Sequence, residues 1–80
     1  MRVTVRFFAA LRETIGSSEM TLDVGPDHDK SANARSIWEQ ATRMPPDPHV
    51  RVAINKTYAD FDAPVVDGDE VAFFPPVTGG

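Results

Sequence analysis

The residues best placed for chemistry close the sequence, which ends Pro75-Pro76-Val77-Thr78-Gly79-Gly80. Two prolines restrict φ and favour an extended, polyproline-like segment. At roughly 3.1 Å per residue, a segment of this length reaches about 19 Å. Because Gly79 and Gly80 have no side chains, a carboxylate on Gly80 is expected to enter a narrow active site that a bulkier end could not.

A Gly-Gly end can also be an ordinary frayed terminus. Here the prolines and the strand before them favour an arm that carries a reactive group. A chain of 80 residues makes one domain, since it buries only a little over ~60% of the surface exposed by its unfolded form. We therefore expect a domain over residues 1–74 and an extended tail over residues 75–80.

The sequence contains no cysteine, which excludes disulfides, thiolate metal sites and cysteine nucleophiles. Any sulfur that this protein handles must therefore sit on another group. A net charge of −4 leaves no basic stripe for nucleic acid, and a protein with a basic patch is the expected kind of partner. No apolar run approaches the ~20 residues of a membrane span, and no signal-peptide pattern opens the sequence. We expect no membrane partner and a cytoplasmic protein.

Other candidate groups are weaker. Asp27-His28-Asp29 has the residue types of a metal site, but a single histidine in an acidic loop is more often solvated, and His49 has no ligand set near it in sequence. Ser17-Ser18 and Thr78 lack a histidine or an acid at fixed spacing, so no hydrolase triad is indicated. We expect no metal site.

The elements that must position the tail follow from periodicity. Alternating apolar residues predict strands over Arg2–Phe8, Met20–Val24, Val50–Asn55 and Val71–Phe74, with a short edge piece at Lys56–Tyr58. Helical spacing predicts a short helix over Ala9–Ile15, closed by Gly16, and a long one over Ser31–Met44, capped by Ser31 and ended by Pro45-Pro46.

In the long helix, Trp38 is predicted to lie in the core, while Asn33 and Ser36 lower the helix propensity. The order strand, strand, helix, strand, strand fits a mixed sheet with one main helix across one face. This is the layout of an α+β, β-grasp (ubiquitin-like) fold, which we therefore expect.

Alternation also directs Phe8 and Phe74 to the sheet face opposite the core, where an apolar patch needs a purpose. Together with Tyr58 they are predicted to form a docking surface, the alternative being that one of them is core. Asp67, Asp69 and Glu70 either steer the protein to a basic partner or form a solvated turn.

Both ends of the sequence resemble one family. The runs Val52–Thr57 and Asp67–Gly80, and the opening Val5–Ala9 with Leu11–Glu13 and Ile15-Gly16, are similar to the small subunits of molybdopterin synthase, the MoaD/ThiS sulfur-carrier family. The segment Phe-Phe-Pro-Pro-Val-Thr-Gly-Gly after Gly-Asp-Glu-Val is the most specific part of the resemblance.

The resemblance implies a mechanism without a permanently bound cofactor. An ATP-dependent enzyme would adenylate Gly80, and sulfur from a persulfide enzyme would displace AMP to leave a thiocarboxylate. The large subunit of the synthase, which is expected to hold the catalytic side chains, would then pass that sulfur to a cyclic pyranopterin phosphate. The same fold and tail also suit a sulfur carrier for thiamin thiazole synthesis or a ubiquitin-like protein modifier. A binding module without tail chemistry is the remaining alternative.

Overall fold

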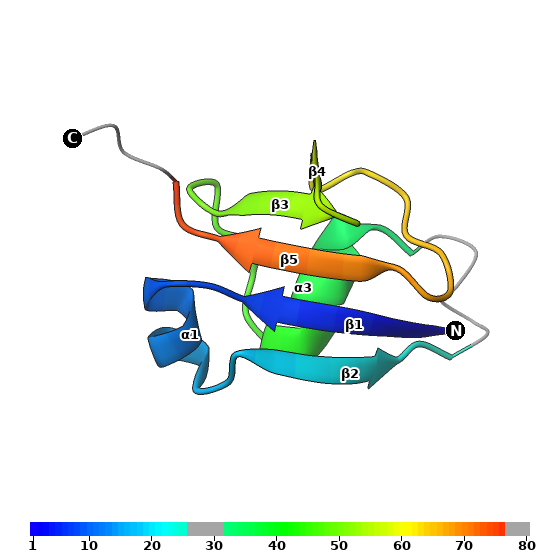
Figure 1. Cartoon of the computed structure of the whole chain (residues 1–80), viewed down its shortest axis with the longest axis horizontal. Coiled ribbons are helices and arrows are strands. Elements are labelled where there is room, and N and C mark those ends of the chain that lie inside the picture. Colours follow the sequence, from blue (N-terminus) through cyan, green and yellow to red (C-terminus); the bar gives the residue numbers. More distant parts are fainter. Residues whose placement is uncertain (26–31, 77–80) are drawn as a thin grey trace.

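The computed structural model describes residues 1–25 and 32–76. Along the chain its elements are β1 (Arg2–Phe7), α1 (Ala10–Ile15), β2 (Glu19–Asp23), α3 (Ala34–Thr42), β3 (Arg51–Ile54), β4 (Thr57–Ala59) and β5 (Glu70–Phe74). The strands form one sheet in the order β2-β1-β5-β3-β4 (Figure 1). The central strand β5 pairs parallel with β1 and antiparallel with β3, so the predicted mixed sheet is confirmed.

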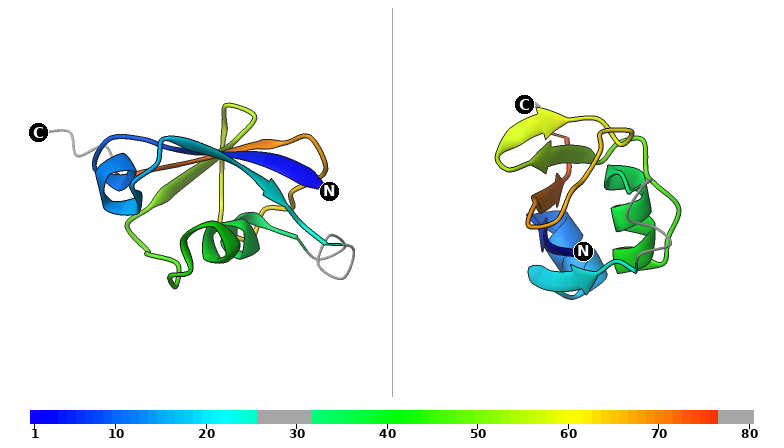
Figure 2. Two further views of the ribbon diagram at one scale, coloured as in Figure 1. Left: turned by 90° about the horizontal axis from the view of Figure 1, so that it is seen from below. Right: turned by 90° about the vertical axis from the view of Figure 1, so that its right-hand side faces the viewer.

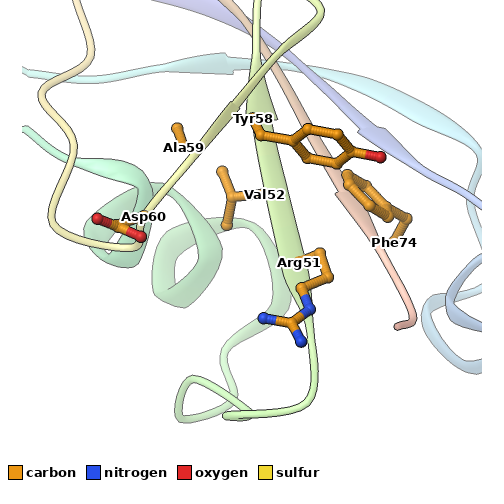
Figure 3. Close-up of a pocket in the computed structure, with 6 residues that line it drawn as sticks. All are labelled: Arg51, Val52, Tyr58, Ala59, Asp60 and Phe74. Atoms are coloured by element: carbon orange, nitrogen blue, oxygen red, sulfur yellow. The ribbon is translucent and has the colours of Figure 1, made fainter. Parts of the chain in front are cut away.

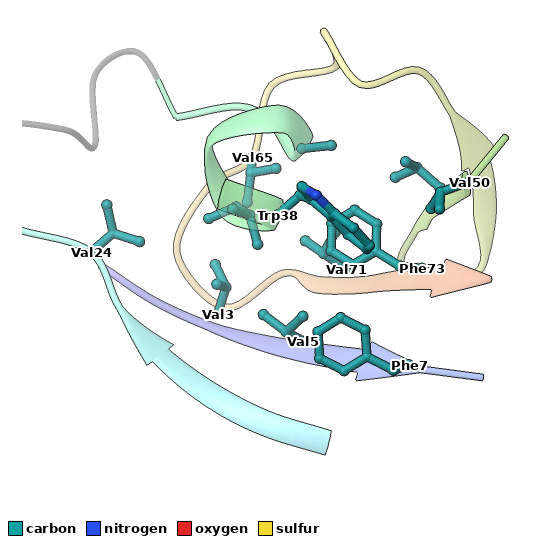
Figure 4. Packing of buried hydrophobic residues seen from close by; sticks show 12 residues of the cluster. Val3, Val5, Phe7, Val24, Trp38, Val50, Val65, Val71 and Phe73 are labelled. Atoms are coloured by element: carbon teal, nitrogen blue, oxygen red, sulfur yellow. The ribbon is translucent and has the colours of Figure 1, made fainter. Parts of the chain in front are cut away.

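The core lies between this sheet and α3, which crosses one sheet face (Figure 2). Alternate residues of the two central strands point toward the helix and are at most 1% exposed; they are Val3, Val5, Phe7, Val71 and Phe73. Burial of each such side chain contributes roughly 1.5–3 kcal/mol. The helix buries Ile37 and Trp38 against them, which confirms the core position of Trp38 (Figure 4).

The start of the long helix differs from the prediction. Ser31 lies outside the described residues, and the N-cap is Asn33, whose side chain accepts a hydrogen bond from the Ser36 amide at 2.8 Å. The Ser36 hydroxyl accepts in turn from the Asn33 amide at 3.0 Å. The two residues expected to weaken the helix therefore begin it, because their short polar side chains satisfy amides that have no partner within the helix.

The end of the same helix also comes earlier than predicted. Arg43 adopts the left-handed conformation, with φ of 60°, and its amide donates to the Glu39 carbonyl at 2.9 Å. The helix thus ends at Thr42, before Pro45-Pro46 is reached. In α1 the predicted glycine cap is confirmed, since Gly16 has φ of 85° and its amide donates to the Arg12 carbonyl.

Strand boundaries shift by one or two residues. The first strand ends at Phe7 rather than Phe8, because Ala9 turns the chain with φ of 53° before α1. The edge strand is Thr57–Ala59, and it follows a turn in which Asn55 and Lys56 both have positive φ, at 51° and 69°. Two such residues match the twist of an antiparallel hairpin and join β3 to β4 tightly.

The acidic turn before β5 has a structural role in addition to its charge. The Asp67 carboxylate accepts a hydrogen bond from the Arg2 amide at 2.7 Å. The Asp69 carboxylate accepts from the Val66 amide and from the Asn55 side chain, both at 2.9 Å. These bonds tie the loop that leads into β5 to β1 and to the β3–β4 turn.

Candidate functional site

The tail follows β5, the central strand of the sheet. Phe73 of β5 is 0% exposed, and its ring packs on Phe7, Trp38 and Phe61 with centroid distances of 6.0, 5.1 and 6.1 Å. The Phe73 carbonyl also accepts a hydrogen bond from the Phe8 amide at 3.1 Å. The strand from which the tail leaves is thus held by packing on one side and by neighbouring strands on both edges.

Pro75 and Pro76 follow β5 directly and are half-buried. Proline has no backbone N–H, so the sheet ladder cannot continue along this edge. The remaining predicted tail residues, Val77, Thr78, Gly79 and Gly80, lie outside the described residues.

The three predicted docking residues lie together on the sheet face opposite α3. Phe74 and Tyr58 stand side by side with their ring centroids 5.8 Å apart (Figure 3). Tyr58 is 78% exposed and Phe8 39% exposed, which excludes the alternative that either is core. We call Phe8, Tyr58 and Phe74 the outer patch.

Small residues make a hollow in the outer patch. Ala72 of β5 lies opposite Ala53 of β3 in the ladder, and Ala53 in turn lies opposite Tyr58 of β4. Because alanine is short, these two positions form the floor of a hollow of about 350 Å³ whose rim includes all three aromatic residues. The hollow depends on strand register and was not foreseen from sequence.

Charged side chains border the outer patch. The guanidinium carbon of Arg6 lies 5.2 Å from the centroid of the Phe8 ring, a cation–π distance. Arg6 Nη1 lies 3.5 Å from Glu70 Oε1, whereas Arg6 Nε, which is buried, lies 3.8 Å from Glu19 Oε1 and makes no hydrogen bond among the described residues. Arg51 stands opposite Phe74 in the ladder and is exposed. Arg6 and Arg51 thus both lie on the outer face of the sheet.

At the far end of the same face, Arg2 forms an ion pair with Asp23 of the same chain. Its Nε lies 3.0 Å from Asp23 Oδ1, and this hydrogen bond, together with the charge of Asp23, raises the pKa of Arg2 above its ordinary value. Arg2 therefore stays charged, and in this structure its guanidinium is paired with Asp23.

Within the part of the chain that the structure describes, the weaker candidates do not form a site. His49 Nδ1 lies 3.3 Å from Asp47 Oδ1 on the surface, and Asp27-His28-Asp29 lies outside the described residues. Among residues 1–25 and 32–76, no three potential ligands come together as a metal site. In the same part of the chain, no helix is long and apolar enough to span a membrane.

Fold and site together define a class: a ubiquitin-like β-grasp domain with a Gly-Gly tail leaving its central strand. A model of the ThiS family matches residues 5–80, and the chain belongs to that family. The Escherichia coli (strain K12) molybdopterin synthase sulfur carrier subunit is 41% identical over 98% of this chain and 99% of its own length.

Solved structures agree on the fold. The H. volcanii small archaeal modifier protein 1 superposes with a TM-score of 0.73 at 27% identity, over 95% of this chain and 98% of its own. A chain from the complex of subunits 1 and 2 of the molybdopterin-converting factor from Helicobacter pylori 26695 superposes with a TM-score of 0.62 over all of both chains. Its identity is 24%, so this second likeness concerns the fold alone. The predicted β-grasp class is confirmed.

Proposed function

We propose that this member of the ThiS family is the sulfur carrier subunit of a molybdopterin synthase. The observation that carries the proposal is the 41% identity, over nearly the full length of both chains, to a relative of that function. The structure supports it physically, because a tail that does chemistry inside another protein needs a rigid base, and Phe73 anchors that base in the core.

The working group is the carboxylate of Gly80. A carboxylate is a poor electrophile, so it must first be activated, and an ATP-dependent enzyme adenylates Gly80. The outer sulfur of an enzyme persulfide then displaces AMP to form an acyl disulfide, and a thiol cleaves its S–S bond, which releases a thiocarboxylate on Gly80 and leaves a disulfide on the donor. The thiocarboxylate gives its one sulfur to a cyclic pyranopterin phosphate on the large subunit and returns to a carboxylate by hydrolysis. Two such transfers build the dithiolene of molybdopterin. The described residues contribute by holding and presenting the tail, and the AMP adduct and the sulfur are transient.

The outer patch is the proposed docking surface for the adenylating enzyme and the large subunit. Its exposed aromatic rings and the hollow between them are the features of a small interface core. The Escherichia coli relative, at 41% identity, is named as a subunit of molybdopterin synthase, which supports a large-subunit partner here. We place the protein in the cytoplasm, where these enzymes would be met.

A second candidate function is that of a protein modifier, which would join Gly80 to an amine of another protein. The likeness to the H. volcanii modifier favours it, with a TM-score of 0.73. A sulfur carrier for thiazole synthesis uses the same tail with another acceptor enzyme, and the ThiS family match is compatible with it.

Intact-mass spectrometry separates these functions. The chain is incubated with the adenylating enzyme, ATP and a persulfide donor, with and without a protein extract. Exchange of oxygen for sulfur adds about 16 Da to a carrier, whereas a modifier gains the mass of another protein. A chain whose mass stays unchanged under all conditions would refute both. Supplying the large subunit with pyranopterin substrate, or the thiazole enzyme instead, identifies the acceptor.

A further inference from the structure

The outer patch differs in charge from the rest of the protein. The chain as a whole has 12 acidic and 8 basic side chains. Two adjoining hollows that share Tyr58 and Phe74 are lined by three of those basic side chains, Arg6, Arg51 and Lys56. Only Asp60 and Glu70 oppose them in that lining, so an acidic protein presents a locally cationic docking face.

The three cations are not equivalent. Arg6 lies between Glu70 and Glu19 and packs on Phe8, so its charge is largely used within the protein. Within residues 1–25 and 32–76, neither Arg51 nor Lys56 has a carboxylate oxygen within 4.0 Å of its charged group. Both are exposed and can pair with a group from outside.

Arg51 lies where its charge can contact a partner that binds the tail. In the ladder it stands opposite Phe74, the last residue of β5 before Pro75-Pro76. Directly opposed residues of an antiparallel pair have their Cβ atoms about 4.5–5.5 Å apart. A partner that covers Phe74 therefore lies next to Arg51, whose exposed guanidinium extends away from the rings of Phe74 and Tyr58 (Figure 3).

We propose that Arg51, assisted by Lys56, pairs with acidic side chains on the large subunit, beside an apolar side chain that fills the hollow above Ala53 and Ala72. This inference rests on the proposed function and specifies the partner's surface: apolar at its centre and acidic at its rim. It reverses the expectation from net charge, by which an acidic protein would meet a basic surface. A guanidinium suits this role because its planar fork binds carboxylates in a bidentate manner.

The test measures binding of the unmodified chain to the large subunit by titration calorimetry at low and high salt. Arg51→Glu is expected to weaken binding roughly tenfold or more, because it opposes like charges across the interface. Arg51→Gln is expected to weaken it less and to reduce the dependence of affinity on salt. If Arg51→Glu does not fold, the affinity and salt dependence of Arg51→Gln still decide the test. Circular dichroism shows whether each variant is folded.

Arg43→Glu is the matched control. It changes the net charge equally, but Arg43 lies at the end of α3 on the other side of the sheet, beside Glu39 and Gln40. Binding by this variant should equal that of the wild type. Equal weakening by Arg43→Glu and Arg51→Glu would mean that only net charge matters and would overturn the proposal. Unchanged or tighter binding by Arg51→Glu would overturn it as well.

The proposed function fails in a separate way. If the wild-type chain gains no sulfur mass in the loading assay, the carrier function is wrong, whatever the binding data show. If it gains that mass while Arg51→Glu binds as wild type does, only the acidic partner surface is wrong.

Discussion

Replacing Phe73 and Phe74 by alanine, one at a time, separates stability from docking. The two residues are neighbours on β5 but point to opposite faces of the sheet. Phe73 is fully buried among three aromatic rings, whereas Phe74 is half-buried and contacts Tyr58. We therefore expect Phe73→Ala to lower mainly the stability of the fold, and Phe74→Ala to lower mainly the affinity for the large subunit.

The magnitudes follow from burial. A buried phenylalanine replaced by alanine costs roughly 3–5 kcal/mol, because a cavity adds to the lost transfer energy. In a domain of this size each 1 kcal/mol lowers Tm by about 4–8 °C, so Phe73→Ala should lose at least about 12 °C. Phe74→Ala loses mainly one aromatic pair, about 0.5–1.5 kcal/mol. As a docking residue it should instead weaken binding of the large subunit about ten- to thirtyfold.

Urea unfolding followed by circular dichroism gives the stability change, and titration calorimetry with the large subunit gives the affinity. The reasoning is refuted if Phe74→Ala lowers stability as much as Phe73→Ala does, since β5 would then not divide core from surface. It is also refuted if Phe74→Ala binds the large subunit with the affinity of the wild type.

Three further predictions concern the tail, the N-cap of α3 and the acidic turn before β5. Deleting Gly80, or adding one residue after it, should abolish the gain of sulfur mass with the fold intact by circular dichroism; normal loading of either variant would contradict the tail mechanism. Asn33→Ala should lower stability by about 1 kcal/mol through loss of the helix cap, measured by urea unfolding, and a change within error would show that the capping box contributes nothing. Asp69→Ala removes the acceptor of the Val66 amide and of the Asn55 side chain. It should lower the free energy of unfolding by about 1–3 kcal/mol, and a Tm equal to that of the wild type would show that these two hydrogen bonds do not stabilise the fold.

The central strands were predictable because their signal is local. Alternation in β1 and β5 assigns each residue to a face, and the structure buries Val71 and Phe73 as the pattern requires. The long helix was less well predicted at its ends. Asn33 and Ser36 have low helix propensity, yet the same polar side chains cap the first turn, so a scale of propensities gives the wrong sign at that position.

The acidic turn shows a different limit of sequence reasoning. Charge alone suggested steering or solvation for Asp67 and Asp69, whereas the structure engages both in hydrogen bonds to distant backbone or side-chain groups. The partner of Asp67 is 65 residues away in the chain. No local pattern encodes such a contact.

The sequence alone determined the features that are local or compositional. These are the alternating strands, the absence of a thiol and the slim tail ending in Gly80. Which side chains share the docking face depended on strand order and register. Long-range pairing places Arg51 opposite Phe74, and Ala53 between Ala72 and Tyr58. The physical reason is that ladder hydrogen bonds join segments far apart in the chain, so the hollow and its cationic rim exist only once β3, β4 and β5 lie side by side.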